Sequence, residues 1–445
     1  MEPLLAAPSP PPPKPPRLAS LDIVRGLTVA LMIFVDDVGG AFPSLAHSPW
    51  DGVTLADSVM PAFLLLTGVS IALSPGTPTR VLRRTLRLFL LGLLLQGGGW
   101  FSSYSYGYNW YTLRPMGILQ RIAFGYAAAS CSGCTGAQLL LTYTLYVPSW
   151  SSLYGEGGLL AHPVPVECAV RAAVHSPECT AAGMLHRAVF GQHRLAVWMS
   201  ARMEQCSPCS PGDYDAVFRP GCVEPANATR DRPAWCLAHA YDPEGLLPTL
   251  GTLLSVWLGV HCGQLLLAVP RRALPLHWAA LGGGLAGGGL ALDAAGLRMN
   301  KQLWSLSYAL FEAGACVLAL AAAHCLVDLH PHPHRRVAAR LARGARALLL
   351  PFEAMGMNAI FFFFWHGTAE AIINALYVAP PAVGGGIAYP REQGALLGTH
   401  GWVRVHLFGW VGSAAAAQLC LVLTKIAAFL AVGCVCHRYR YFWKI

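Results

Sequence analysis

Long apolar runs separated by short polar loops dominate this chain. A membrane-spanning helix needs roughly 20 predominantly apolar residues. Runs near that length begin close to Leu21, Val53, Val81, Gly117, Ala137, Leu246, Leu274, Leu303, Leu348 and Ser413. The fourth and fifth runs are short, partly polar and separated only by CSGCTG. The pattern therefore predicts an all-α, polytopic transmembrane helix bundle of about ten spans, with nine or eleven left open.

Composition supports a multi-pass membrane protein over a soluble one, since 55% of the 445 residues are hydrophobic and 12% are charged. The net charge of +9 has a topological explanation. If the N-terminus is cytoplasmic, every basic cluster in a short loop falls on the cytoplasmic side, as the positive-inside rule requires. These clusters comprise Lys14, Arg17, Arg80, Arg83, Arg84, Arg87, Arg271, Arg272, Arg335, Arg336, Arg340, Arg343, Arg346, Arg438, Arg440 and Lys444. Both termini are thus predicted to be cytoplasmic, and nothing indicates nucleic-acid binding.

The transmembrane domain is predicted to cover residues 18–445, with a tail before it and one long insertion within it. Residues 1–17 are proline-rich and lack the features of a cleavable signal, so we interpret them as a disordered cytoplasmic tail. The only long polar interruption, about 149–243, is predicted to be luminal and carries a glycosylation sequon at Asn227.

That luminal insertion also holds an even number of cysteines: Cys168, Cys179, Cys206, Cys209, Cys222 and Cys236. In an oxidising compartment this favours disulfides, with the pairing open. A zinc site built on Cys206, Cys209, Cys222 and Cys236 is the less favoured alternative. We therefore expect no metal.

Ionisable groups inside a bilayer cost about 3 kcal/mol each on insertion scales, so each needs a reason. Asp22 and Arg25, three residues apart, are interpreted as a structural ion pair. The other candidates are the outer-end acids Asp36 and Asp37, together with Arg121, Asn358 and His366. Structural alternatives stand beside them: a snorkelling anchor for Arg121, a helix bridge for Asn358 and a packed histidine for His366.

His47 and Asp57 form the strongest candidate pair. His47 lies between two apolar runs in the stretch LAHSPWDGVTLADSV, and Asp57 follows ten residues later. A histidine oriented by a carboxylate can take a proton from a nucleophile near neutral pH, and it can also become acylated. We predict that His47 and Asp57 carry the chemistry. Asp36 and Asp37 are candidate contacts for a substrate amine.

Several blocks in sequence order resemble one known family. They are the stretch from Ser20 to Leu73, LRPMGILQRIAFGY from Leu113, AYDPEGLLPTLGTLLSVWLGVHCGQLLL from Ala240, MNKQLWSLSYAL from Met299, GMNAI from Gly356 and the terminal FWKI. Together they are similar to the catalytic membrane region of the heparan-α-glucosaminide N-acetyltransferase family, and in particular to its plant members, which share the VDD reading at Asp36.

The resemblance implies acetyl transfer from cytoplasmic acetyl-CoA to the amino group of a glucosamine-like luminal acceptor. It places the family's active-site histidine at His47, its second-helix aspartate at Asp57 and the basic residue of its LQR block at Arg121. Asn300 and Lys301, in the NKQLW block, are assigned with Asp36, Asp37, Arg121, Asn358 and His366 to substrate or cofactor binding. His186 stands where the family usually has aspartate, and we expect this protein to lack the large luminal N-terminal domain of the animal enzymes.

Two other classes of protein compete with the enzyme. A polytopic transporter would use buried polar residues to line a path, and an inactive structural relative would turn over no amine. The resemblance also implies an endomembrane location, such as lysosome, vacuole or Golgi, with the bilayer and a luminal amine-bearing acceptor as partners. A homodimer is left open, as is the choice between an acetyl-histidine intermediate and direct transfer.

Overall fold

A computed structural model describes residues 18–39, 42–74, 76–95, 113–128, 133–155, 158–195, 241–329, 336–375, 377–378 and 397–443. Within these ranges the protein is mainly helical, as predicted. The helices of its first half are α1 (Ala19–Val38), α2 (Val59–Leu73), α3 (Pro78–Leu95), α4 (Ile118–Ala127), α5 (Gly133–Thr144) and α6 (Ala181–Phe190). Those of the second half are α8 (Leu246–Ala268), α9 (Leu274–Ala294), α10 (Leu306–Ala323), α11 (Arg336–Gly356), α12 (Ala359–Ala375), α13 (Thr399–Phe408) and α14 (Ala414–Arg438).

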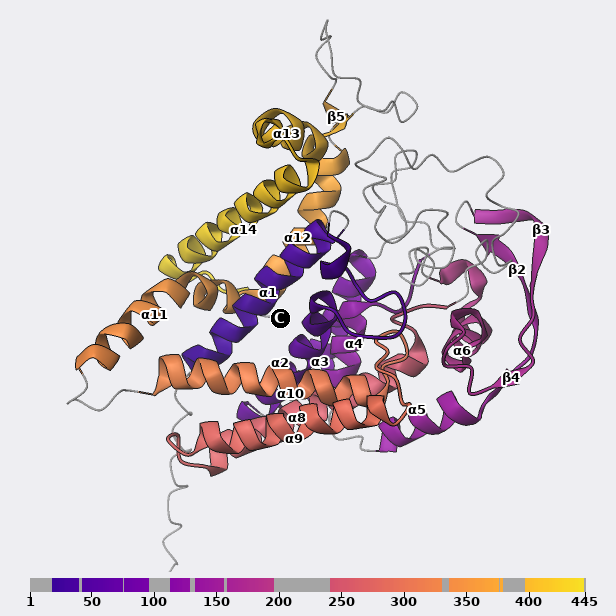
Figure 1. Cartoon of the computed structure of the whole chain (residues 1–445), viewed down its shortest axis with the longest axis horizontal. Coiled ribbons are helices and arrows are strands. Elements are labelled where there is room, and N and C mark those ends of the chain that lie inside the picture. Colours follow the sequence, from indigo (N-terminus) through magenta and orange to yellow (C-terminus); the bar gives the residue numbers. More distant parts are fainter. Residues whose placement is uncertain are drawn as a thin grey trace, which may run out of the picture.

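The core consists of closely packed helix pairs. In Figure 1, α8, α9 and α10 lie along one side of the bundle, while α1, α11 and α14 form a second group. Glycines let the backbones approach: a Cβ on Gly68 of α2 would overlap Val256 O of α8, and one on Gly356 of α11 would overlap Asp22 O of α1. Small residues at helix contacts are the usual means of close packing inside a membrane.

Four described helical segments are long and apolar enough to cross a bilayer: Leu55–Leu73, Leu246–Ala268, Leu306–Val327 and Ala415–Arg438. A fifth span results if Arg346–Gly356 and Ala359–Thr368, bent by 69°, count as one. The other predicted runs are helical too, but α4 and α5 have only 10 and 12 residues. At 1.5 Å per residue neither crosses the roughly 30 Å hydrocarbon core by itself. A membrane helix protein is therefore supported, and about ten spans remains a prediction.

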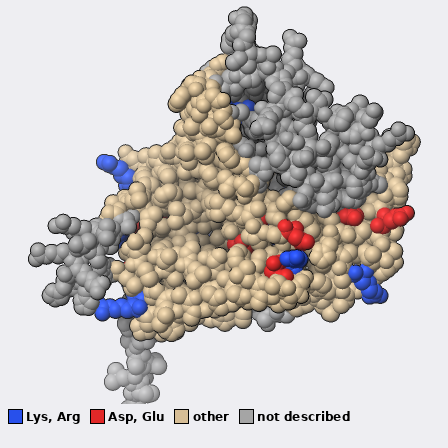
Figure 2. Space-filling view, viewed as in Figure 1, with Lys and Arg blue, Asp and Glu red and all other residues tan. Residues whose placement is uncertain are grey.

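The outer surface fits a lipid environment. Large apolar side chains are exposed on the helices, for example Leu276 (74%) and Leu290 (55%) on α9. Figure 2 shows a broad face without charged atoms, whereas the blue and red side chains gather near its margins and in one group to the right of centre. In water such a surface would be an aggregation hazard, but in hydrocarbon it is favourable.

The described part of the 149–243 insertion forms a small folded unit together with residues 146–147. It contains the antiparallel pair β2 (Trp150–Gly155) and β3 (Gly158–Val166), the short pair β1 (Tyr146–Val147) and β4 (Val170–Arg171), and helix α6. A third short pair, β5 (Tyr377–Val378) and β6 (Leu397–Gly398), lies outside this unit, between α12 and α13. These strands are the departure from a purely helical prediction.

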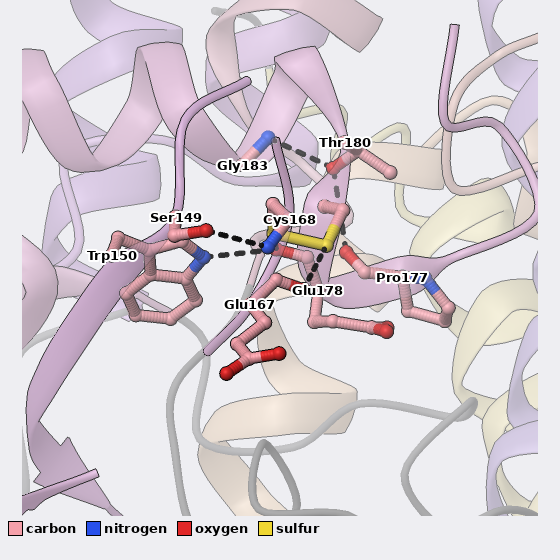
Figure 3. The surroundings of a disulfide bond; sticks show 9 residues. Ser149, Trp150, Glu167, Cys168, Pro177, Glu178, Thr180 and Gly183 are labelled. Carbon is pink, nitrogen blue, oxygen red and sulfur yellow. Dashed lines mark hydrogen bonds between the residues drawn. A yellow bond between two sulfur atoms is a disulfide. The ribbon is translucent and has the colours of Figure 1, made fainter. Parts of the chain in front are cut away.

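A disulfide joins Cys168 to Cys179. Figure 3 shows the bond beside Trp150, whose indole N–H donates to Glu178 O at 3.3 Å, and beside Ser149, whose hydroxyl accepts from Cys168 N at 3.0 Å. The other four candidate cysteines, Cys206, Cys209, Cys222 and Cys236, lie outside the described residues, as does Asn227.

The contact between α1 and α11 predicts an asymmetric response to added methyl groups. Gly356→Ala should destabilise the protein by about 1–3 kcal/mol, because the new Cβ would displace the α1 backbone. Gly283→Ala on α9, where no atom lies within 4 Å of the new Cβ, should leave stability equal or slightly higher. Thermal unfolding in detergent measures both variants. Equal melting temperatures would contradict the close approach.

Candidate active site

A buried carboxylate organises the loop that carries His47. Asp57 lies in the short helix η2 (Leu55–Ser58) and is fully buried. Its Oδ2 accepts from the backbone N–H of Ser48, the backbone N–H of Thr54 and the Thr54 hydroxyl, each at 3.0 Å. The Thr54 hydroxyl also contacts Ala46 O at 2.6 Å. These bonds close residues 46–57 into a compact turn and fix the direction of the second oxygen.

That second oxygen, Oδ1, faces His47 and Lys301. Nδ1 of His47 lies 2.9 Å from Oδ1, and Nζ of Lys301 lies 3.3 Å from the same atom. Lys301 Nζ is also 2.8 Å from His47 Nδ1 and 3.4 Å from Nε2. The His47 side chain is 36% exposed and that of Lys301 is 16% exposed. The structure thus brings His47 and Asp57 together with Lys301, which lies 254 positions from His47 in the sequence.

Backbone contacts between two loops bring Lys301 to this position. Gly52 donates its N–H to Met299 O at 2.8 Å with a φ of +103°, which favours glycine. The Asn300 amide donates to Asp51 at 3.3 Å and accepts from Leu303 N at 2.9 Å. Asn300 therefore shapes the loop that presents Lys301, which suits a structural function for its side chain.

Two arrangements of protons are compatible with these distances. If Nδ1 of His47 carries the proton and donates to Asp57, Nε2 has a free lone pair and can accept a proton or an acyl group. If Nε2 carries the proton, Nδ1 can accept from the Lys301 ammonium instead. In both, the carboxylate stabilises positive charge on either neighbour. This is the equipment of general-base or nucleophilic chemistry.

Two side chains of helix α10 bond residues of the same turn. The Tyr308 hydroxyl donates to Asp57 O at 2.8 Å, and the hydroxyl of Ser58 donates to Glu312 Oε1 at 3.0 Å. Glu312 is 2% exposed. Glu312 was not among the residues predicted from the sequence, although a single acid within the apolar run LSYALFEAGACVLALAAA is a recognisable signal.

Arg121 lies behind the Lys301 loop. It is buried, donates to Pro243 O, and places its guanidinium 5.3 Å from the centre of the Trp304 ring. The contact with Trp304 links Arg121 to the loop of Lys301, three residues earlier. Among the described residues Arg121 therefore supports this loop and has no direct hydrogen bond to His47.

A second ionic cluster, absent from the predicted site, joins residues 113–117 to the start of α8. Arg114 makes two bonds to Asp242, at 3.0 and 2.7 Å, and one to Glu244 at 2.7 Å. Burial opposes ionisation of Asp242, but Arg114 outweighs it and lowers the pKa of that carboxyl. His186 is fully buried 4.0 Å from Asp242, and burial lowers the pKa of its imidazole.

The remaining predicted contacts gather elsewhere, where α1 meets α12 and α14. Asp37 pairs with Lys425 at 2.8 Å, and Asp36, which is 45% exposed, lies 3.8 Å from His366. Asn358, at the bend between α11 and α12, bonds Tyr441 O and Trp443 N, both at 2.9 Å. These contacts join α1 to α12 and to α14, and the bend between α11 and α12 to the residues that follow α14. Asp22 and Arg25 form the expected ion pair at 2.8 Å.

Residues 17–147, which include His47 and Asp57, match the family model described as the catalytic region of heparan-alpha-glucosaminide N-acetyltransferase. The suspected family resemblance is confirmed. The human heparan-alpha-glucosaminide N-acetyltransferase is 27% identical over 398 residues, which cover 80% of this chain and 53% of the relative. The mouse protein of the same name is 25% identical over 334 residues, covering 66% and 46%. The chain thus spans about half the length of these relatives.

The pair of half-buried Arg114 and buried Asp242 predicts a stability effect with a defined pH dependence. Asp242→Asn should destabilise the protein by about 1.5–3 kcal/mol, since it removes the buried carboxylate and leaves Arg114 with Glu244 as its acidic partner. A depressed folded-state pKa means that the contribution of Asp242 is present above its ordinary value of 3.8 and lost as pH falls through the lower folded value.

The melting-temperature gap between wild type and Asp242→Asn should therefore be similar at about pH 7 and pH 5 and narrow below about pH 4. Glu167→Gln, a change at an exposed acid of the insertion, is the control and should shift nothing. A gap already lost at pH 5 would contradict the assignment.

Proposed function

We propose that this protein is a transmembrane acetyltransferase that moves an acetyl group from cytoplasmic acetyl-CoA to an amino group of a luminal, glucosamine-like acceptor. The observation that carries this proposal is the contact of His47 with both Asp57 and Lys301. His47 and Asp57 lie in the segment that matches the family's catalytic model. The relatives' names supply the acetyl group and the amino-sugar acceptor.

In the reaction His47 has two chemically sound uses. Its Nε2 can remove a proton from the acceptor amine as that nitrogen attacks the thioester. Alternatively, Nε2 attacks the thioester first, and the acetyl-imidazole then passes the acetyl group to the amine. In either case Asp57 holds the ring through Nδ1 and stabilises the positive charge that develops on it.

Lys301 suits stabilisation of the oxyanion. When a nucleophile adds to the thioester carbonyl, the oxygen gains negative charge, and an ammonium beside the reacting nitrogen stabilises that charge. The ammonium also balances the buried charge of Asp57, at 3.3 Å. Lys301 therefore serves a reacting group as well as the fold.

A membrane-embedded site explains how the two substrates could meet. Coenzyme A carries several phosphate charges and does not partition into hydrocarbon, whereas an acetyl group is small and neutral. A reacting histidine within a helical bundle could receive the acetyl group alone. On this proposal the termini are cytoplasmic, the protein resides in an endomembrane, and the exposed Asp36 offers a contact for the acceptor amine.

Replacing the histidine gives the first functional prediction. His47→Ala should abolish transfer of radiolabelled acetyl from acetyl-CoA to every member of a panel of amino sugars and polyamines, because neither chemical route survives without the imidazole. His277→Ala, which removes an exposed histidine on α9, is the matched control and should retain full turnover. Turnover in His47→Ala equal to the control would defeat the assignment.

Replacing Lys301 gives the second functional prediction. Lys301→Met should lower kcat on the order of 10²-fold, the usual cost of removing one oxyanion donor. Lys301→Arg keeps the positive charge and should recover part of that loss. Steady-state kinetics on reconstituted protein measure both variants. Equal values of kcat for Lys301→Met and Lys301→Arg would show that the charge at position 301 does not act in the reaction.

A further inference from the structure

Glu312 is a carboxyl group that the proposed reaction has not used. It lies on α10 within the apolar segment Leu306–Val327, which is long enough to cross a membrane, and is 2% exposed. A carboxyl group at such a position needs a reason, since its burial in the charged form is costly. Among the described residues, the hydrogen bond to its side chain comes from Ser58, at 3.0 Å.

The carboxyl groups of Asp57 and Glu312 have different hydrogen-bond and ion-pair partners, although Ser58, the residue after Asp57, bonds Glu312. Asp57 accepts bonds from two backbone N–H groups and the Thr54 hydroxyl, and it contacts His47 and Lys301. Glu312 has one hydroxyl donor, and no cation of the described residues lies within ion-pair distance of it. Environments this different favour the ionised form of one carboxyl group and the protonated form of the other.

The groups that face Glu312 support this division. Asp57 and Lys301 both act on it electrostatically, and Tyr308 and Cys316 lie one turn away on either side along α10. The negative charge of Asp57 discourages a second negative charge nearby, and Lys301 is already bonded to Asp57. Tyr308 and Cys316 are neutral hydrogen-bonding groups, so neither can supply a counter-ion.

Ser58 brings a hydroxyl group to this carboxyl from the turn that holds Asp57. It follows Asp57 directly, is half-buried, and its hydroxyl donates to Glu312 Oε1. A hydroxyl can donate and accept at the same time, and therefore can pass a proton between two neighbours. This inference rests on the proposed acetyltransferase function. We propose that Glu312 exchanges a proton with the reacting groups in each catalytic cycle. Because it acts through Ser58, Glu312 is a positioning residue.

The proton count of the reaction provides the use for such a group. An acceptor ammonium and acetyl-CoA give an acetamide, free coenzyme A thiol and one released proton. The bond from the acetyl carbon to sulfur breaks and a bond from that carbon to nitrogen forms. The leaving thiolate takes a proton from the Glu312 carboxyl group. The acceptor nitrogen loses two protons. One goes to water, and the other, which His47 removes in the general-base route, returns Glu312 to its starting state.

Glu312→Gln keeps the acceptor oxygen for Ser58 but cannot release or bind this proton. We expect kcat to fall on the order of 10²-fold, with KM nearly unchanged and one limb of the wild-type pH profile absent. Ser58→Ala should lose the same limb with Glu312 intact. Glu353→Gln on α11 is the matched control and should keep wild-type kinetics.

Infrared spectroscopy of the reconstituted protein gives a readout independent of activity. The wild type should show a protonated carboxyl C=O band that shifts in deuterated water and is missing in Glu312→Gln but present in Glu353→Gln. An active wild type, with an unchanged pH profile and an unchanged band in Glu312→Gln, would overturn the inference and leave the acetyltransferase proposal standing. A wild type without acetyl transfer would instead refute the proposed function.

Discussion

The buried carboxylate of Asp57 is the constraint on which the rest of the site depends. Its oxygens are bonded by the loop that carries His47, by Thr54 and by Lys301. A fully buried acid is tolerable only when its charge is paired and its lone pairs are used. The contacts that compensate for the burial of Asp57 also fix His47 and Lys301. The same interactions therefore stabilise the fold and position the reacting groups.

Residues from several elements pack around the loops that hold that carboxylate. Gly52 and Asn300 join the two loops, Trp304 and Arg121 pack behind them, and Tyr308 and Glu312 approach from α10. The Arg114 and Asp242 pair holds the start of α4 near the start of α8. These residues come from distant parts of the chain, so the geometry of the site depends on the packing of the whole helical bundle.

The sequence was informative where the signal was local. Apolar runs located the helices, and ten-residue spacing with a plausible turn identified His47 with Asp57. It was silent about contacts that only the tertiary structure creates. Nothing near Lys301 indicates that its ammonium reaches His47, and Arg114 carries no mark of its partner Asp242. Glu312 could have been found, since a lone acid in an apolar run is a recognisable signal. The lengths of α4 and α5 could not, because helix ends depend on packing.

The central claim is that one site within the membrane serves substrates on opposite sides. Sealed vesicles with uniformly oriented protein test it most directly: labelled acetyl-CoA is added to the cytoplasmic face and an amino sugar is trapped at the other. The account predicts that labelled acetamide accumulates on the side of the amino sugar while free coenzyme A appears on the side of acetyl-CoA. Acetylation only when both substrates share one side would contradict it.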